Sequence, residues 1–286
     1  MITVGHLLGR VFSQKNRLLT AADWQKFQSA EGLADWLSRL QSTDYAAAVE
    51  HAGTYAEFEK YLHQTLAALR QDLFDKKDTI AEIFWQKYDW HNLKILLKEK
   101  LTEQNLDKYL LPLGKNTLSA FEPRLIEQAI EIYTQTTDFC QMDYFLDQEY
   151  FAWLKKASKR LGAEVKAYVR AQIDIANFKL WGKDFPCFPG GDVSLDLFAQ
   201  DTPEETLRKC FPEIDLPREF NDGIVEKVLD DYANKLLCQG HYSDSRTAIF
   251  RFLQAKENEV KNLKTMYLSQ SRALPAMQTY LRYSYV

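Results

Sequence analysis

Apolar residues recur every three or four positions along most of this chain, which is the spacing of one face of an α-helix. Proline is absent before Pro112, so little interrupts this pattern in the first third of the sequence. No alternating run is long enough to predict a β-strand. We therefore expect an all-α protein. Helices are predicted over residues of about 4–19, 54–75, 119–135, 141–160, 163–183, 204–211, 219–238 and 243–270, with others beginning at Ala22, Gly32 and Thr79.

A short polar pattern occurs three times on these predicted helices. It consists of an acid, two residues, an asparagine, one apolar residue and a lysine. Asn92, Asn177 and Asn262 are separated by 85 residues at each step, and such a period indicates an internal repeat. The pattern predicts three related helical subdomains, covering residues 1–100, 101–186 and 187–286, with the third closing against the N-terminal helix. The nine repeated residues are Asp89, Asn92, Lys94, Asp174, Asn177, Lys179, Glu259, Asn262 and Lys264.

On a helix, the first copy places its polar residues around an apolar stripe. Trp90 and Leu93 belong to the stripe, Asp89 lies close to it, and Asn92 and Lys94 flank it on opposite sides. A half-buried carboxylate needs a partner, and an asparagine there can bond the backbone of a neighbouring loop or helix end. Two interpretations follow. Either each copy holds its helix against its neighbours, or the three copies line a shared pocket or contact a partner.

Composition narrows the classes of function. A chain of 286 residues that is 46% hydrophobic and 27% charged can bury a sizeable core. Its formal net charge of −4 gives no electrostatic reason to bind nucleic acid. No run approaches the roughly 20 apolar residues that span a bilayer, and the N-terminus lacks the pattern of a secretory signal, so we expect a soluble protein. The four cysteines form no Cys-x-x-Cys pair, and we expect reduced, mostly buried thiols.

Candidate catalytic groups are weak. Carboxylates on helices can hold Mg²⁺ and a diphosphate, and the candidates are Asp72 with Asp75 and the pair Asp230–Asp231. One turn beyond that pair stand Asn234 and Lys235, which are poor ligands. The five histidines are scattered, with no pair four residues apart on a helix. The sequence therefore predicts no catalytic residue, no metal site and no cofactor.

Several stretches together resemble a known family, the C subunits of the V-type and A-type ATPases, which are called d subunits in eukaryotic vacuolar enzymes. Residues 88–98 are similar to the family's Asp-x-x-Asn-x-Lys helix, and Asp174–Lys179 to the second occurrence of that helix. The remaining similar stretches are 252–264 with Leu274-Pro275, Pro189-Gly190-Gly191, and Leu7–Val11 with Leu18-Leu19. The resemblance extends over nearly the whole chain.

The resemblance implies a funnel of three similar helical subdomains with a central hollow. It implies a non-catalytic central-stalk subunit, peripheral at the cytoplasmic face of the membrane. Such a protein couples the rotating shaft of an ATP-driven or ATP-synthesising complex to the ion-translocating ring. The implied partners are the central-shaft subunits and the membrane ring of proteolipid subunits, with no nucleic acid and no direct membrane span. The alternatives are a helical-repeat scaffold that binds another protein and a helical metal enzyme.

Overall fold

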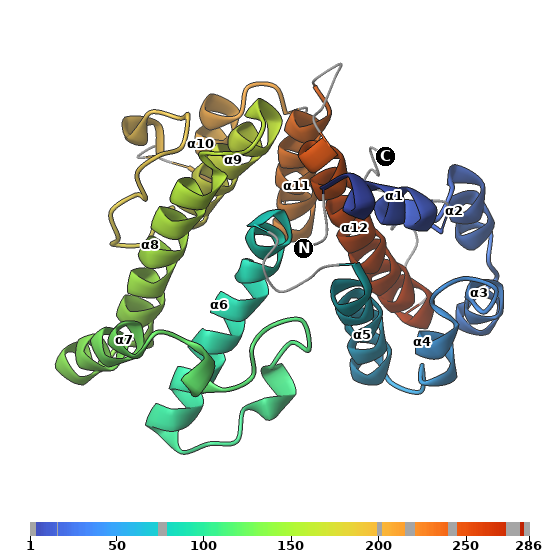
Figure 1. The fold of residues 1–286 in the computed structure, drawn as a ribbon, viewed down its shortest axis with the longest axis horizontal. Helices are drawn as coiled ribbons and strands as arrows, with labels where there is room; N and C mark the ends of the chain where they lie inside the picture. Colours follow the sequence, from blue (N-terminus) through green and yellow to red (C-terminus); the bar gives the residue numbers. More distant parts are fainter. Residues whose placement is uncertain are drawn as a thin grey trace.

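The computed structural model describes residues 4–15, 17–73, 79–198, 202–214, 221–239, 245–272 and 281–282. These residues form twelve α-helices and three short 3₁₀ helices, and no strand occurs among them (Figure 1). The prediction of an all-α fold is confirmed. The α-helices are α1 (Val4–Lys15), α2 (Ala21–Gln28), α3 (Leu33–Leu40), α4 (Ala46–Glu50), α5 (Tyr55–Leu73), α6 (Thr79–Thr102), α7 (Pro123–Thr136), α8 (Phe139–Ser158), α9 (Ala163–Lys179), α10 (Pro203–Cys210), α11 (Asp222–Cys238) and α12 (Ser245–Arg272). The 3₁₀ helices are η1 (Asp107–Tyr109), η2 (Leu118–Ala120) and η3 (Leu195–Phe198).

Local chemistry explains several helix starts. Thr20 and Asp23 form a capping box at α2, in which each side chain pairs with the other residue's backbone N–H. Thr202 caps α10 by accepting a hydrogen bond from the Glu205 N–H, and Asn221 caps α11 in the same way. Such caps satisfy N–H groups that have no partner within the helix.

The structure also corrects some predicted boundaries. The short helix α4 was not predicted, because five residues give too little periodicity to detect. The first helix ends at Lys15 rather than near residue 19, and α9 ends at Lys179 rather than near residue 183. Gly182, with a left-handed φ of 73°, turns the chain away just after α9. Leu274-Pro275, one of the stretches that resemble the family, lies outside the described residues.

The long helix α12 is the element around which the others pack. It contacts α1, α3, α5, α6, α9 and α11, and it crosses the middle of the molecule in Figure 1. Its central residues are buried on all sides, including the charged side chains of Lys256, Glu257 and Glu259. A surface helix buries only one stripe of its circumference. The burial of α12 is therefore that of a core helix, although it carries charged residues.

The helix contacts follow the 85-residue repeat. The three helices that carry the repeated pattern are α6, α9 and α12, which we call the motif helices. Each packs against the helix that precedes the next motif helix: α6 against α8, α9 against α11, and α12 back against α5. The last motif helix thus returns to the first part of the chain.

The core has two parts. The main cluster includes Trp36, Phe58 and Trp85 and extends through most helices. A smaller cluster forms around Leu93 and Leu97 on the C-terminal half of α6, where α7 and α8 cover it. The helix α6 therefore belongs to both clusters, and it connects the N-terminal helices to the pair α7–α8.

Candidate functional site

The three repeated asparagines make the same two hydrogen bonds. Each side-chain amide donates to the backbone carbonyl of one downstream residue and accepts from the N–H of that same residue. Asn92 pairs in this way with Leu111 (2.8 and 2.8 Å), Asn177 with Phe188 (3.0 and 2.6 Å), and Asn262 with Arg282 (2.9 and 2.8 Å). All three asparagines are at most 3% exposed. We call each of these arrangements a clamp, because it holds a segment of backbone against a motif helix.

The acid of the pattern extends the first two clamps. Asp89 Oδ1 accepts a hydrogen bond from the Lys115 N–H at 2.9 Å, and Asp174 Oδ2 accepts one from the Asp192 N–H at 2.8 Å. In both repeats the acid holds the fourth residue after the one that the asparagine holds. Two side chains, one turn apart on the helix, therefore fix a five-residue loop at both of its ends.

The two clamped loops share a sequence pattern of their own. Residues 111–115 read Leu-Pro-Leu-Gly-Lys, and residues 188–192 read Phe-Pro-Gly-Gly-Asp. A Cβ at Gly191 would collide with Asp174 Oδ1, and a Cβ at Gly114 would collide with the Tyr88 carbonyl. Glycine is needed at both positions because the loop backbone lies directly on the helix. Sequence reasoning did not relate these two stretches to each other, although their shared Pro-x-Gly pattern could have revealed a second repeated signal.

The third clamp is divided between two distant segments. Asn262 holds Arg282, whereas Glu259 accepts hydrogen bonds from the Leu19 N–H and from the Tyr45 hydroxyl (2.7 Å). Lys256 lies 2.9 Å from the same carboxylate. Glu259 thus contacts Leu19, which lies 240 residues earlier in the sequence, and α12 holds both an early and a late segment of the chain.

The three lysines of the pattern behave differently from one another. Lys94 on α6 pairs with Asp147 on α8 at 2.6 Å, and Lys264 on α12 pairs with Glu59 on α5. Both pairs join a motif helix to the neighbour that it packs against. Lys179 is exposed at the end of α9 and makes no ion pair with the part of the chain that the structure describes. In the first two patterns the acid and the asparagine therefore act together on one loop, and in all three the lysine acts separately.

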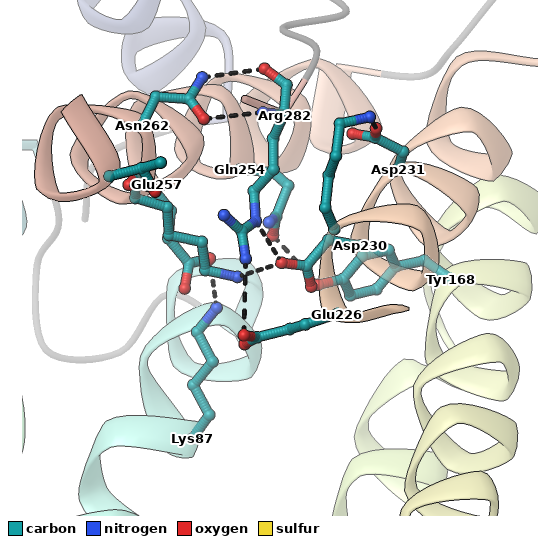
Figure 2. A network of polar contacts seen from close by, with 12 residues as sticks. Lys87, Tyr168, Glu226, Asp230, Asp231, Gln254, Glu257, Asn262 and Arg282 are labelled. Carbon is teal, nitrogen blue, oxygen red and sulfur yellow. Dashed lines mark hydrogen bonds and ion pairs between the residues drawn. The ribbon is translucent and has the colours of Figure 1, made fainter. Parts of the chain in front are cut away.

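A buried charge network joins the first and third motif helices (Figure 2). Glu257 on α12 pairs with Lys87 on α6 and accepts a hydrogen bond from the Tyr88 hydroxyl at 3.0 Å. One helical turn further along α12, Lys261 pairs with Asp230 on α11 at 2.9 Å. Sequence reasoning did not find this network, because its members lie on three helices and follow no shared spacing.

Arg282 is where the network meets the third clamp. Its backbone is held by Asn262, while its guanidinium donates to Asp230 at 2.5 Å and lies 3.8 Å from Glu226 (Figure 2). Burial alone would raise the pKa of Asp230, but Lys261 and Arg282 outweigh it and lower that pKa to about 2. Asp230 is therefore a fixed anion that holds α11, α12 and the 281–282 segment together.

Asp174 in the second clamp has the opposite electrostatic character. Burial raises its pKa to about 6, and the hydrogen bonds from the Asp192 and Val193 N–H groups oppose this only in part. Arg170, a cation that also lowers this pKa, is itself paired with Asp192 at 2.7 Å. A raised carboxyl pKa can indicate a proton-transfer group, but both Asp174 oxygens here contact loop backbone, which is a structural use.

The carboxylates and histidines that the sequence offered as candidate metal ligands do not form a metal site within the described residues. Asp230 is engaged as described, and Asp231 pairs with Lys227 at 2.7 Å. Asp75, His241 and the side chains of Asp72 and His6 lie outside the described residues, and within those residues no group of three metal-ligating side chains occurs.

The prediction of mostly buried thiols is wrong: only Cys210 is buried, Cys187 and Cys238 are half-buried, and Cys140 is exposed. None of the described helices is both long and apolar enough to cross a bilayer.

Comparison with known proteins shows the family of this chain. The family described as ATP synthase (C/AC39) subunit matches residues 7–183, which include the first two motif helices and the first clamped loop. This chain belongs to that family. It is also similar to the C subunit of the V-type sodium ATPase of Enterococcus hirae, with 22% identity over 277 residues, which covers 81% of this chain and 83% of the relative. The resemblance to the V-type ATPase C subunits that the sequence suggested is confirmed.

The clamp of the second repeat can be tested through its asparagine. We expect Asn177→Ala to lower the free energy of unfolding by about 2–4 kcal/mol, because it leaves the buried N–H and C=O of Phe188 unpaired. Urea unfolding of the purified protein measures this. Lys179→Ala, two residues away at an exposed position, should change the stability by less than about 0.5 kcal/mol. An unchanged stability of the Asn177 variant would contradict a structural role.

The close approach of the loop can be tested through its glycine. We expect Gly191→Ala to destabilise the fold by about 1–3 kcal/mol, because the new methyl group displaces the Asp174 carboxylate. Gly9→Ala is the matched control, since α1 leaves open space there and alanine is the better helix former, so that variant should be slightly more stable. In a double-mutant cycle, the costs of Gly191→Ala and Asp174→Ala should be less than additive. Full additivity would show that the two groups do not interact.

The charge network predicts a specific acid sensitivity. The pKa of Asp230 is about 2 in the folded protein, against an ordinary value of 3.8 for an aspartate, so its stabilisation is complete above about pH 4 and is lost as the pH falls through 2. The loss amounts to about 2 kcal/mol. In urea titrations at pH 5 and pH 3, Asp230→Asn should be less stable at pH 5 and should lose less on acidification than the wild type. Glu226→Gln, at the exposed end of the network, should retain the wild-type acid sensitivity; equal sensitivity in all three proteins would contradict the assignment.

Proposed function

We propose that this protein is a non-catalytic central-stalk subunit of a rotary V-type or A-type ATPase, which couples the rotating shaft to the membrane ion-translocating ring. Its family membership and its similarity to the C subunit of a V-type ATPase support the assignment to such a complex. The observation that carries the coupling role is the threefold clamp. The acids and asparagines of the repeated pattern hold backbone segments in place, and they do not come together in one shared site.

In this proposal, the three subdomains of residues 1–100, 101–186 and 187–286 form a funnel around a central hollow that receives the shaft. The cyclic packing of α6 on α8, α9 on α11 and α12 on α5 supports such a closed arrangement. The ring of proteolipid subunits then lies below the funnel, and the protein is peripheral at the cytoplasmic face of the membrane.

Torque transfer requires a body that does not shear between its two interfaces. Buried hydrogen bonds and charge pairs between helices supply such resistance, because breaking one without replacing it leaves an uncompensated polar group in the core. Within the network, the pair Lys87–Glu257 joins the first repeat to the third, whereas Lys261 and Arg282 tie α12 and the 281–282 segment to Asp230 on α11 inside the third repeat. These contacts are therefore suited to transmit load through α12. The alternative of a helical-repeat scaffold for another protein is not favoured by the comparisons.

Deletion of this subunit from its native cells tests the proposal. We expect membranes from the deletion strain to lose ATP-driven ion pumping by the V-type or A-type enzyme, and reintroduction of the wild-type chain to restore it. As a control, Lys179→Ala should restore pumping as well as the wild type does. Unchanged pumping in the deletion strain would overturn the proposed function.

A further inference from the structure

The second motif helix is shorter than the other two. The helix α9 ends at Lys179, two residues after Asn177, whereas α6 and α12 each continue for ten residues beyond Asn92 and Asn262. The difference of eight residues corresponds to about two helical turns. Gly182, three residues after the helix end, has a left-handed φ of 73°. The second repeat therefore has a clamp like that of the first, but its motif helix does not continue beyond the clamp as α6 and α12 do.

A pocket of about 400 Å³ lies against this shortened end of α9. It is lined chiefly by apolar residues from the end of the helix and from the segment that follows it, among them Leu180, Trp181, Phe185, Leu195 and Phe198. Leu195 is 48% exposed and is among the few large apolar side chains of the described residues that face solvent to that extent. A concave apolar surface of this size falls within the range of ligand-binding sites.

The other two repeats show what fills the corresponding end of a motif helix. In α6 the continuation places Leu93 and Leu97 in the smaller core, and in α12 it buries Leu263 and Met266. Each of these two repeats thus uses apolar side chains from the helix beyond its asparagine. In the second repeat α9 supplies only the first of them, Phe178, which matches Leu93 and Leu263, and the helix ends one residue later.

The charge of the pocket adds a further requirement. Lys183 is the one charged residue that lines it among the residues described, and no carboxylate of those residues lines it. An occupant that brings an acidic group beside its apolar side chains would pair with this ammonium group, while a basic occupant would be repelled. Apolar packing with one complementary charge is the pattern of an amphipathic helix in a groove.

We propose that this pocket binds about two turns of an amphipathic helix from another subunit of the same ATPase complex, with an Asp or Glu beside its apolar face, which meets Lys183. The bound segment completes the second repeat in trans, as α6 and α12 complete theirs within the chain. This inference rests on the proposed function, because it takes the partner from the assembled complex.

Site-specific cross-linking in the assembled enzyme tests the inference. A photoreactive amino acid replaces Leu195 in the full chain, the complex is isolated by a tag on a catalytic-sector subunit, and cross-linked peptides are identified by mass spectrometry. We expect a cross-link to a helical segment of another subunit that carries an acidic residue. Tyr109, which is 51% exposed on η1 just before the first clamped loop, is the control position and should not cross-link to that segment. Absence of any cross-link from position 195 to another subunit would overturn the inference.

Substitutions provide a second measurement. Leu195→Glu and Lys183→Glu should each reduce the amount of this protein retained in the washed complex at least tenfold, while Lys183→Arg should retain it. The thermal unfolding temperature of each isolated variant should match that of the wild type, since both side chains are exposed. Full retention of both glutamate variants would count against the inference, as would a small molecule found by native mass spectrometry on the isolated wild-type chain and lost in Leu195→Glu.

The two proposals fail in different ways. If the wild-type chain does not copurify with the ATPase, the proposed function fails, and this inference fails with it. If the chain copurifies and supports pumping, but position 195 contacts no other subunit, only the inference fails.

Discussion

The structure depends on the pairing of a buried asparagine amide with the two backbone polar groups of a single residue. A loop that lies on a buried helix must satisfy its N–H and C=O groups, since leaving them unpaired costs more than the net gain from making the bonds. One asparagine satisfies both at once. Because only backbone atoms are recognised, the held residue can be leucine, phenylalanine or arginine, as Leu111, Phe188 and Arg282 show. The same fastening therefore works at three places with different surroundings.

The third copy joins parts of the chain that are far apart in sequence. There the clamp holds no continuous loop but joins Leu19 and Arg282 to α12, which is also the helix that carries the buried charges Lys256, Glu257 and Glu259. Buried charges are tolerable only while their partners are in place, and the partners from other segments come from α6, at Lys87 and Tyr88, and from the N-terminal part of the chain, at Leu19 and Tyr45. The helix α12 cannot keep its environment if any of these segments detaches. The whole body should consequently unfold as one unit.

Sequence reasoning found what is local and periodic. The repeated step of 85 residues located the three asparagines, and the helical spacing gave the all-α fold, because each signal is contained within one helix. The Leu19 N–H that Glu259 accepts lies 240 residues away, and the charge network joins three helices, so no spacing along the chain marks them. The sequence predicted that the helix of the second copy extends to about residue 183, because Leu180 and Trp181 continue its apolar spacing. The helix α9 instead ends at Lys179, before the left-handed Gly182. The two clamped loops could have been found from the sequence, since each contains a Pro-x-Gly pattern whose glycine lies where only glycine fits.

The three repeats agree in how they are held together and differ in what they present outward. The motif helix of the first repeat ends in the smaller cluster, and that of the third ends in the main cluster. The motif helix of the second repeat ends early beside a pocket, with the exposed Lys179 at its end. Asymmetry of this kind costs the fold little, because the clamps do not depend on the residues that differ. The proposed function requires the protein to engage its partners in one orientation, and such differences serve that requirement, since three identical faces could not select among three equivalent registers. The second repeat, where the internal pattern is least complete, is therefore the part of the molecule best able to define that orientation.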